Sequence, residues 1–312
     1  MKTNKRVRRR RTILVTIAAL VVGTVFIFRS FLLDVTFLRL ASPERAIVES
    51  RDIAYRPGSS NPKHRLDVFA PAGAHGAAVI HFIHGGYWVG GDKDYHSWAT
   101  SLYASVGRAL AARGIVTVVQ SYRLVPEVPY ADVVDDVMAG LRWTEQHAAE
   151  FGGDPARLFM MGHSAGGQLV ALAAADDTLH TSRGMDPGAV RGTIAISAVW
   201  DIADMHATQD AAFQERVTYP VFGHDVASWA LASPLAQLHA PARRFLIMSG
   251  ERDYPYLVPQ ANNARARLTA LGAPPVWYVA PGNDHDAMVL KLGARGDNVI
   301  QPIVDFVRQE GR

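Results

Sequence analysis

The chain has 312 residues, 49% of them hydrophobic, which is enough for one well-buried domain of ordinary α/β size. It contains no cysteine, so disulfides, thiolate nucleophiles and cysteine metal sites are excluded. The formal charge of +3 arises at the N-terminus, because without the seven basic side chains of residues 1–11 there are 25 basic against 29 acidic side chains. The domain therefore lacks the basic excess typical of nucleic-acid binding, and no nucleic-acid partner is expected.

The N-terminus combines this basic tail, residues 1–11, with an apolar run at 13–28 that has no charged side chain. The basic flank argues against a buried helix, and no small-x-small cleavage pattern directly follows the run. We therefore expect residues 12–33 to form a signal anchor, with a cleaved signal peptide as the alternative, and residues 34–46 to form a juxtamembrane link. Because basic flanks stay in the cytoplasm, residues 47–312 are expected outside it, anchored to the membrane or secreted after cleavage.

From residue 47 onward, apolar strand-like runs alternate with amphipathic segments of helical length. Beyond an early strand at 47–55, strands are expected near residues 66–69, 79–83, 115–120, 158–161, 193–196, 245–248 and 276–279. Helices are expected near 97–112, 131–151, 165–175, 258–271 and 298–308. This alternation predicts an α/β fold with a mostly parallel sheet covered on both faces. The polar first two strands indicate an antiparallel edge.

One stretch, residues 201–232, breaks the alternation. It follows an expected strand and Trp200, and it carries aromatic side chains among polar ones. A long insertion at the rim of such a sheet is typical of a cap over a pocket. Ordinary helices packed on the sheet edge are the alternative, and both interpretations can hold together.

Residues 162–166, Gly-His-Ser-Ala-Gly, have the pattern GxSxG between an apolar run at 158–161 and a helix-forming run at 168–174. A serine on a sharp strand-to-helix turn is held in a strained conformation, and the glycines avoid collisions with the adjoining elements. The new helix also directs its N–H groups and positive dipole end at the reacting atom. Ser164 is therefore the predicted nucleophile.

Residues 84–88, His-Gly-Gly-Tyr-Trp, follow the apolar run at 79–83. A nucleophilic serine needs backbone N–H donors for the oxyanion of the tetrahedral intermediate, and glycines let that backbone approach the substrate closely. The predicted donors are the N–H groups of Gly85, Gly86 and Ala165.

With these motifs the chain resembles the α/β-hydrolase superfamily, specifically the hormone-sensitive-lipase-like esterases and their feruloyl-esterase-like and kynurenine-formamidase relatives. The resemblance covers nearly everything from about Asp67 onward. It rests on segments 84–88 with Gly91-Asp92, 121–127 (Ser-Tyr-Arg-Leu-Val-Pro-Glu), 153–157 (Gly-Asp-Pro-Ala-Arg) and 162–167. Many lipase-like members have a third glycine where this chain has Tyr87, which implies a narrower choice of alcohol groups. Tyr87, Trp88 and Trp200 are the expected substrate contacts.

The fold implied by the resemblance supplies an acid and then a histidine after the nucleophile. His285 follows the expected last strand at 276–279 and is the predicted base. Three other downstream histidines precede the penultimate strand and fit less well: His206, His224 and His239.

The acid should follow the strand at 245–248. Related families place it a few residues past the glycine of the segment Ser-Gly-Glu-Arg-Asp, which implies Asp253. Glu251 is the second choice, and Asp284 and Asp286, beside the histidine, are more distant alternatives.

Two groups of charged residues are expected to be structural. Arg123 and Glu127 could form a buried pair that braces the oxyanion loop, or a surface pair. Asp132, Asp135 and Asp136 fall on one expected helix, where a solvated face is a better interpretation than a metal cluster. No metal and no organic cofactor are expected.

Together these features predict a membrane-anchored serine carboxylesterase that acts through an acyl-enzyme on small or medium acyl or aryl esters. The His-Gly-Gly-Tyr-Trp variant suggests an arylformamidase-like amide hydrolase as an alternative. A catalytically silent α/β-hydrolase that serves as a binding module is the alternative from another class.

Overall fold

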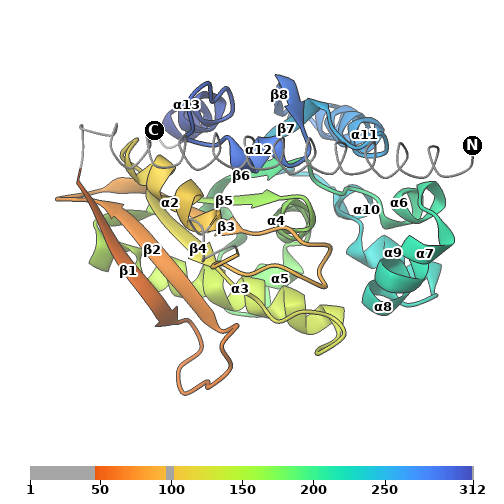
Figure 1. Ribbon diagram of the computed structural model, residues 1–312, viewed down its shortest axis with the longest axis horizontal. Coiled ribbons are helices and arrows are strands. Elements are labelled where there is room, and N and C mark those ends of the chain that lie inside the picture. The colour runs from red at the N-terminus through yellow and green to blue at the C-terminus, as the bar shows by residue number, and fades with distance from the viewer. Residues whose placement is uncertain (1–45, 96–101, 311–312) are drawn as a thin grey trace, which may run out of the picture. The chain divides into compact units, whose positions relative to one another are not determined.

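The computed structural model describes residues 46–95 and 102–310 (Figure 1). Its centre is an eight-stranded sheet in the order β1-β2-β4-β3-β5-β6-β7-β8. The strands are β1 Ile47–Ala54, β2 Arg65–Pro71, β3 Ala77–Ile83, β4 Val116–Gln120, β5 Gly153–His163, β6 Val190–Ile196, β7 Phe245–Arg252 and β8 Val276–Asp284. The β1–β2 and β2–β4 pairs are antiparallel and the remaining pairs are parallel, which confirms the predicted sheet with its antiparallel edge.

Helices cover both faces of the sheet because its central strands are apolar on both sides. In β3, Ile80 and Phe82 pack with α2 (Leu102–Ala111) and α13 (Ile300–Glu310). Val79 and Ile83 belong to the opposite core, with α3 (Tyr130–His147), α4 (Ala165–Ala175) and α11 (Leu257–Ala270). Every residue of α4 is buried, which suits its run of alanines and leucines.

Several expected boundaries differ from the structure. The helix expected at 131–151 is α3 followed by a 3-10 turn, η1 (Ala148–Phe151), which ends at Gly152 with φ of 79°. Strand β5 begins at Gly153, five residues before the expected start. Strand β8 continues to Asp284, so part of the segment expected to be a loop before His285 is strand.

Residues 201–232 fold into short helices that lie together in Figure 1. Aspartates begin three of them: the side chain of Asp201 accepts a hydrogen bond from the N–H of Asp204, that of Asp210 from Phe213, and that of Asp225 from Ala227. The elements are α6 (Ile202–Thr208), α7 (Ala211–Phe213), a π-helical turn η3 (Gln214–Thr218), α8 (Tyr219–Phe222) and α9 (Val226–Ala232). Outside this segment lie α5 (Thr178–Thr181), η2 (Pro187–Ala189), α10 (Pro234–Gln237) and α12 (Ala287–Leu290).

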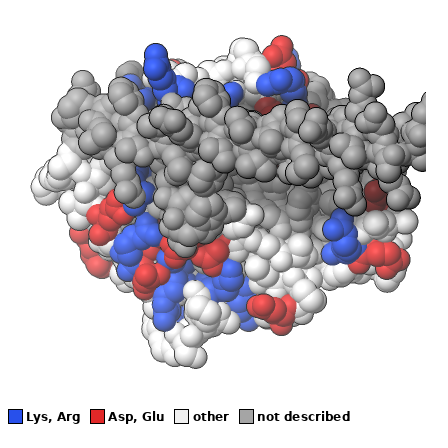
Figure 2. Space-filling view, in the orientation of Figure 1, with Lys and Arg blue, Asp and Glu red and all other residues white. Residues whose placement is uncertain are grey.

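The predicted N-terminal features fall almost entirely outside the described residues. The basic tail, the anchor at 12–33 and all but the last residue of the link belong to the part that the structure does not describe. Within residues 46–95 and 102–310, no helix combines the length and the apolar character needed to span a membrane. On the face seen in Figure 2, acidic and basic side chains of the described residues are interspersed.

Candidate active site

Ser164 lies on the turn between β5 and α4, with φ of 57° and ψ of −120°. This conformation is strained for a residue with a side chain. The turn is tight because glycines flank it: a Cβ on Gly162 would lie 2.2 Å from the carbonyl oxygen of Gly166, and a Cβ on Gly166 would lie 2.2 Å from that of Ile83. The N–H of Ser164 donates to the oxygen of Ile196 at 2.9 Å, which holds the turn against β6.

His285 and Asp253 meet beyond the ends of β8 and β7, which are neighbouring parallel strands. The Nδ1 atom of His285 lies 2.8 Å from Oδ1 of Asp253, and both residues are buried. Asp253 also accepts hydrogen bonds from the N–H groups of Tyr254 and Gly250 and, at 2.5 Å, from the Ser197 hydroxyl. Burial alone would raise the pKa of Asp253, but the hydrogen bonds from His285 and Ser197 outweigh it and leave the pKa below its ordinary value. Asp253 is thus held as an anion.

The other candidate carboxylates do not bond to the His285 ring in the described structure. Glu251 is exposed and accepts a hydrogen bond from the N–H of Gly282 at 2.7 Å. Asp284 accepts one from the N–H of Ala287 at 2.9 Å. Asp286 is exposed and lines the cavity described below. The geometry therefore favours Asp253 as the partner of His285.

His285 is held between two rings. Tyr254 stacks on it with ring centroids 4.2 Å apart and an interplanar angle of 19°, and the ring centroid of His163 lies 4.7 Å from that of His285. The Nε2 atom of His163 lies 3.0 Å from the main-chain oxygen of His285. Burial lowers the pKa of His163 to about 3, so this side chain is neutral and donates to that oxygen.

Three of these supporting residues were not predicted from the sequence. His163 directly precedes Ser164, and Tyr254 directly follows Asp253. This adjacency to a predicted catalytic residue was the only sign of their role in the sequence. Ser197 directly follows β6 and carries no signal in the sequence, because its role depends on β7 lying beside β6.

The predicted oxyanion segment approaches Ser164 closely. A Cβ on Gly85 would lie 3.1 Å from the Cβ of Ser164, so only glycine fits here without displacement. Gly86 has φ of 125°, and its oxygen accepts a hydrogen bond from the N–H of Gly90 at 2.9 Å. Ala165 is the first residue of α4, where an N–H group has no partner within the helix.

His84 stabilises this segment from within the core. Its Nδ1 atom lies 2.7 Å from the oxygen of Gly85, and its ring stacks on Tyr122 at 4.2 Å. The Tyr122 hydroxyl donates to the main-chain oxygen of His84 at 2.9 Å. Burial lowers the pKa of His84 to about 4, which keeps the imidazole neutral and its Nδ1–H available as a donor.

Two lysines hold the far end of the same loop. Lys63 donates to the oxygen of Gly91 at 2.8 Å and pairs with Asp92 at 2.7 Å. The ammonium group of Lys93 is buried beside three carboxylates, those of Asp52, Asp67 and Asp94. The loop that carries the glycines is thus tied to the β1–β2 edge of the sheet.

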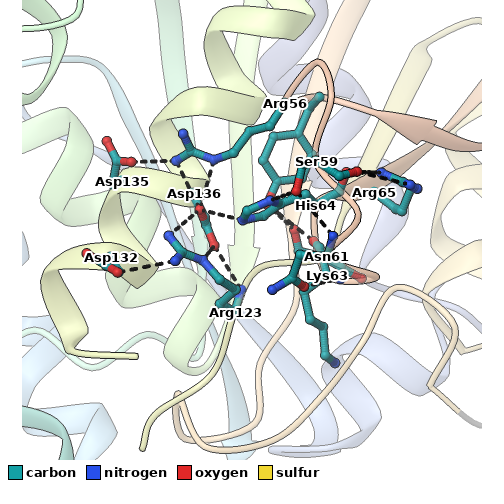
Figure 3. A network of polar contacts seen from close by, with 12 residues as sticks. Arg56, Ser59, Asn61, Lys63, His64, Arg65, Arg123, Asp132, Asp135 and Asp136 are labelled. Carbon is teal, nitrogen blue, oxygen red and sulfur yellow. Dashed lines mark hydrogen bonds and ion pairs between the residues drawn. The ribbon is translucent and has the colours of Figure 1, made fainter. Parts of the chain in front are cut away.

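The prediction of an Arg123–Glu127 pair is wrong. Arg123 binds Asp136 with its Nε atom at 2.7 Å and Asp132 at 3.2 Å, while Glu127 is exposed. The predicted solvated face is also wrong for Asp136, which is completely buried although Asp132 and Asp135 are partly exposed. Figure 3 shows Asp136 between Arg56 and Arg123. Two guanidinium groups compensate the charge of a carboxylate that faces the connection between β1 and β2.

This network contains a second serine–histidine–aspartate arrangement (Figure 3). The Ser59 hydroxyl lies 2.6 Å from Nδ1 of His64, and Nε2 of His64 lies 3.2 Å from Oδ1 of Asp136. It differs from the Ser164 centre because Asp136 is shared with two arginines. Burial lowers the pKa of His64, which weakens it as a base.

A cavity of about 480 Å³ opens on Ser164 and His285. Its walls are mainly aromatic and aliphatic, with glycines on the nucleophile side. The described lining residues are Gly85, Gly86, Tyr87, Gly90, Gly91, Tyr95, Leu102, Tyr103, His163, Ser164, Tyr254, His285, Asp286, Val289 and Leu290. None of these lies in the segment 201–232, which contacts the lining through Phe213, whose ring centroid lies 5.4 Å from that of Tyr87.

The structure brings Tyr87 to this cavity but places Trp88 and Trp200 elsewhere. Trp88 is fully buried, and its indole N–H donates to Oε1 of Gln168 at 2.8 Å. Trp200 is also fully buried and packs against Phe245, with ring centroids 5.6 Å apart. Both tryptophans are core residues, because each large ring is fully buried and neither belongs to the described cavity lining.

Several known esterases are similar to this chain. The Mycobacterium tuberculosis esterase LipQ is 27% identical over 84% of this chain and 63% of its own length. The carboxylesterase NlhH of the same species is 34% identical over 49% of this chain and 44% of its own length. Esterase B from Lactobacillus rhamnosis has a similar structure, with a TM-score of 0.69, 19% identity and coverage of 85% of both chains.

The chain spans less than two thirds of the length of these two curated relatives. Its fold is nevertheless that of the α/β hydrolases, as the resemblance implied. The BD-FAE family model matches residues 66–268, which include both the glycine-rich loop and the nucleophile turn. The chain therefore belongs to the BD-FAE family.

Proposed function

We propose that this chain is a serine carboxylesterase. The observation that carries the proposal is the strained Ser164 on the strand-to-helix turn, with the His285–Asp253 pair beside the same cavity. The esterases and carboxylesterases among its relatives support the same reaction.

In the proposed mechanism, the Ser164 hydroxyl oxygen attacks the ester carbonyl carbon while Nε2 of His285 takes its proton. Asp253 holds the Nδ1–H tautomer and stabilises the imidazolium without accepting the proton. The N–H groups of Gly85, Gly86 and Ala165 are the proposed oxyanion donors. His285 then protonates the departing alcohol, and a water molecule activated by the same base cleaves the acyl-enzyme.

The cavity supports small or medium acyl and aryl esters as substrates. Its volume of about 480 Å³ falls at the lower end of ligand pockets, and its walls are mostly apolar. An arylformamidase activity is the second candidate. Tyr87 beside the nucleophile favours it, and the same acyl transfer would cleave a formamide.

Labelling with a fluorophosphonate probe tests the proposal directly. We expect the full chain to be labelled and to hydrolyse p-nitrophenyl esters, and Ser164→Ala to lose both properties while remaining folded. Turnover of N-formylkynurenine above that of the esters would favour the amide hydrolase. An unlabelled and inactive folded protein would favour the binding module.

We also propose that residues 12–33 anchor the enzyme with residues 47–312 outside the cytoplasm. The basic flank and the uncharged apolar run support this orientation. Protease added to spheroplasts should degrade the domain of an uncleaved, membrane-bound chain. Release of active enzyme into the medium would indicate cleavage, and complete protection would overturn the orientation.

A further inference from the structure

The active-site cavity has an unbalanced charge. Among its described lining residues, Asp286 is the single carboxylate, and none is lysine or arginine. The catalytic acid Asp253 lies behind the imidazole of His285, with four hydrogen bonds to its carboxylate. Among the described lining residues, only the histidines His163 and His285 could therefore carry a positive charge beside Asp286.

The backbone holds Asp286 in a defined place. It directly precedes α12, and its main-chain oxygen accepts hydrogen bonds from the N–H groups of Val289 and Leu290 at 3.1 and 2.9 Å. Its carboxylate does not cap the helix, and within residues 46–95 and 102–310 it forms no hydrogen bond or ion pair. Asp284, on the other side of His285, instead accepts the N–H of Ala287. Of these two neighbours, only Asp286 presents its charge to the cavity.

The influence of this charge extends across the cavity. Burial raises the pKa of Tyr87 and of Tyr103, and the negative charge of Asp286 raises both further. These tyrosines lie on separate elements that line the cavity, the glycine loop and α2. Because the neighbouring side chains Leu102, Val289 and Leu290 are apolar, they offer no dipole that would compensate the carboxylate.

We propose that Asp286 determines the charge selectivity of the enzyme, which accepts neutral and cationic esters and disfavours esters that carry a carboxylate near the scissile bond. This inference rests on the proposed esterase function. A substrate carboxylate would meet an uncompensated like charge, whereas an ammonium group would find a counter-ion. Because Asp286 is exposed, water screens the interaction, and we expect roughly a fivefold to tenfold effect on kcat/KM.

Two substrate series test this on the full-length protein. The first varies the acyl side: p-nitrophenyl butyrate, its hemisuccinate analogue and its 4-(trimethylammonio)butyrate analogue. The second varies the alcohol side: phenyl acetate, 4-acetoxybenzoate and 4-acetoxyphenyltrimethylammonium. The variants are Asp286→Asn and, as a matched control, Asp284→Asn, because asparagine retains the helix-capping ability of aspartate.

In at least one series, we expect Asp286→Asn to raise the anionic-to-neutral ratio of kcat/KM by roughly five- to tenfold and to lower the cationic-to-neutral ratio similarly. Asp284→Asn should leave both ratios unchanged, and salt should compress the wild-type ratios. Unchanged ratios for Asp286→Asn in both series, with the neutral esters still hydrolysed, would overturn this inference alone. Failure of the wild-type protein to hydrolyse the neutral esters would instead overturn the proposed function, and this inference with it.

Discussion

The imidazole of His163 donates a hydrogen bond to the main-chain oxygen of His285 at 3.0 Å, so the residue before the proposed nucleophile also holds the proposed base. The space for His163 depends on Gly85, because a Cβ there would lie 3.3 Å from Nδ1 of His163. The oxyanion segment, the nucleophile turn and the base segment are thus packed around one neutral side chain. His163 is a positioning residue in this arrangement, since it acts through His285.

Loss of this hydrogen bond should affect turnover more than substrate binding. We expect His163→Phe, which keeps a ring but removes the donor, to lower kcat by roughly five- to tenfold with little change in KM. His163→Gln can donate from its amide and should recover much of the loss. Steady-state kinetics of both variants test this, and equal kcat values for them would contradict a role for the hydrogen bond.

The acid assignment makes a sharper prediction. Asp253→Asn should reduce kcat by about 10³- to 10⁴-fold, because an amide cannot hold the Nδ1–H tautomer or stabilise the imidazolium. Glu251→Gln is the matched control, since Glu251 is exposed and bonds only to the Gly282 N–H in the described structure. Its kcat should stay within a fewfold of the wild type. A larger loss in Glu251→Gln than in Asp253→Asn would show that the acid is misassigned.

The second arrangement, Ser59–His64–Asp136, should be catalytically silent. Unlike Ser164, Ser59 does not have a positive φ, and the aspartate of this arrangement, Asp136, is already paired with Arg56 and Arg123. Ser59→Ala should therefore keep fluorophosphonate labelling and kcat/KM, and it should lower the unfolding free energy by about 0.5–1.5 kcal/mol through the lost hydrogen bond. Labelling of Ser59 in the Ser164→Ala protein would refute this distinction.

The difference between these two arrangements shows how far the sequence could predict the site. Ser164 was predictable because a strand, a sharp turn and a helix are local features, each with its own pattern. His285 and Asp253 followed from the order of strands in the family. Asp136 was placed on a solvated face because helical spacing alone does not reveal that Arg56, 80 residues earlier, covers it.

Aromatic side chains were the least predictable. Tyr87 and Trp88 are neighbours with φ of 56° and 63°, yet one lines the cavity and the other is fully buried. Trp88 has a partner in the core, because Gln168 on α4 accepts a hydrogen bond from its indole N–H and Phe222 packs against its ring. Such a partner can be identified only when the packing of α4 against the loop is known.

The buried histidines should make the protein sensitive to acid. Burial lowers the pKa of His81 to about 4, and its ring nitrogens lie 2.9 Å from Thr144 Oγ1 and 2.7 Å from Gln120 Oε1. Because the folded pKa lies below the unfolded value, the unfolded state binds the proton first. His81 therefore contributes stability fully above about pH 6.5, and this stability is lost at about 1.4 kcal/mol per pH unit as the pH falls towards 4.

Urea unfolding at several pH values between 7 and 4.5 tests this linkage. The wild type should lose stability steadily over this range, with His84 and His163 adding to the slope because their pKa values are also lowered, to about 4 and about 3. His81→Gln should be less stable at pH 7. The slope of its unfolding free energy against pH should be smaller than that of the wild type by the contribution of one proton. An identical slope in the variant would mean that His81 is protonated in the folded state or is not buried.

Tyr87 should limit the size of the alcohol group. Its ring lines the cavity beside Gly86, and its edge packs against Phe213 at 5.4 Å. A glycine at this position relieves the positive φ of 56°, but it also removes the ring that holds the loop. We therefore expect Tyr87→Gly to improve the relative kcat/KM for secondary and tertiary alcohol acetates while lowering kcat for small primary esters.

Tyr87→Phe separates the size of this ring from its hydroxyl group. Burial and the neighbouring Tyr254 raise the pKa of Tyr87, and Tyr254 stacks on His285 with ring centroids 4.2 Å apart, so loss of the Tyr87 hydroxyl could disturb the base without widening the cavity. If ring size limits the alcohol, Tyr87→Phe should keep the wild-type order of primary, secondary and tertiary acetates, whatever its kcat. If the Phe and Gly variants shift this order equally, the hydroxyl is responsible. A lower melting temperature with an unchanged order in Tyr87→Gly would instead assign Tyr87 to packing alone, because the loop would have lost stability and the cavity would have gained no usable space.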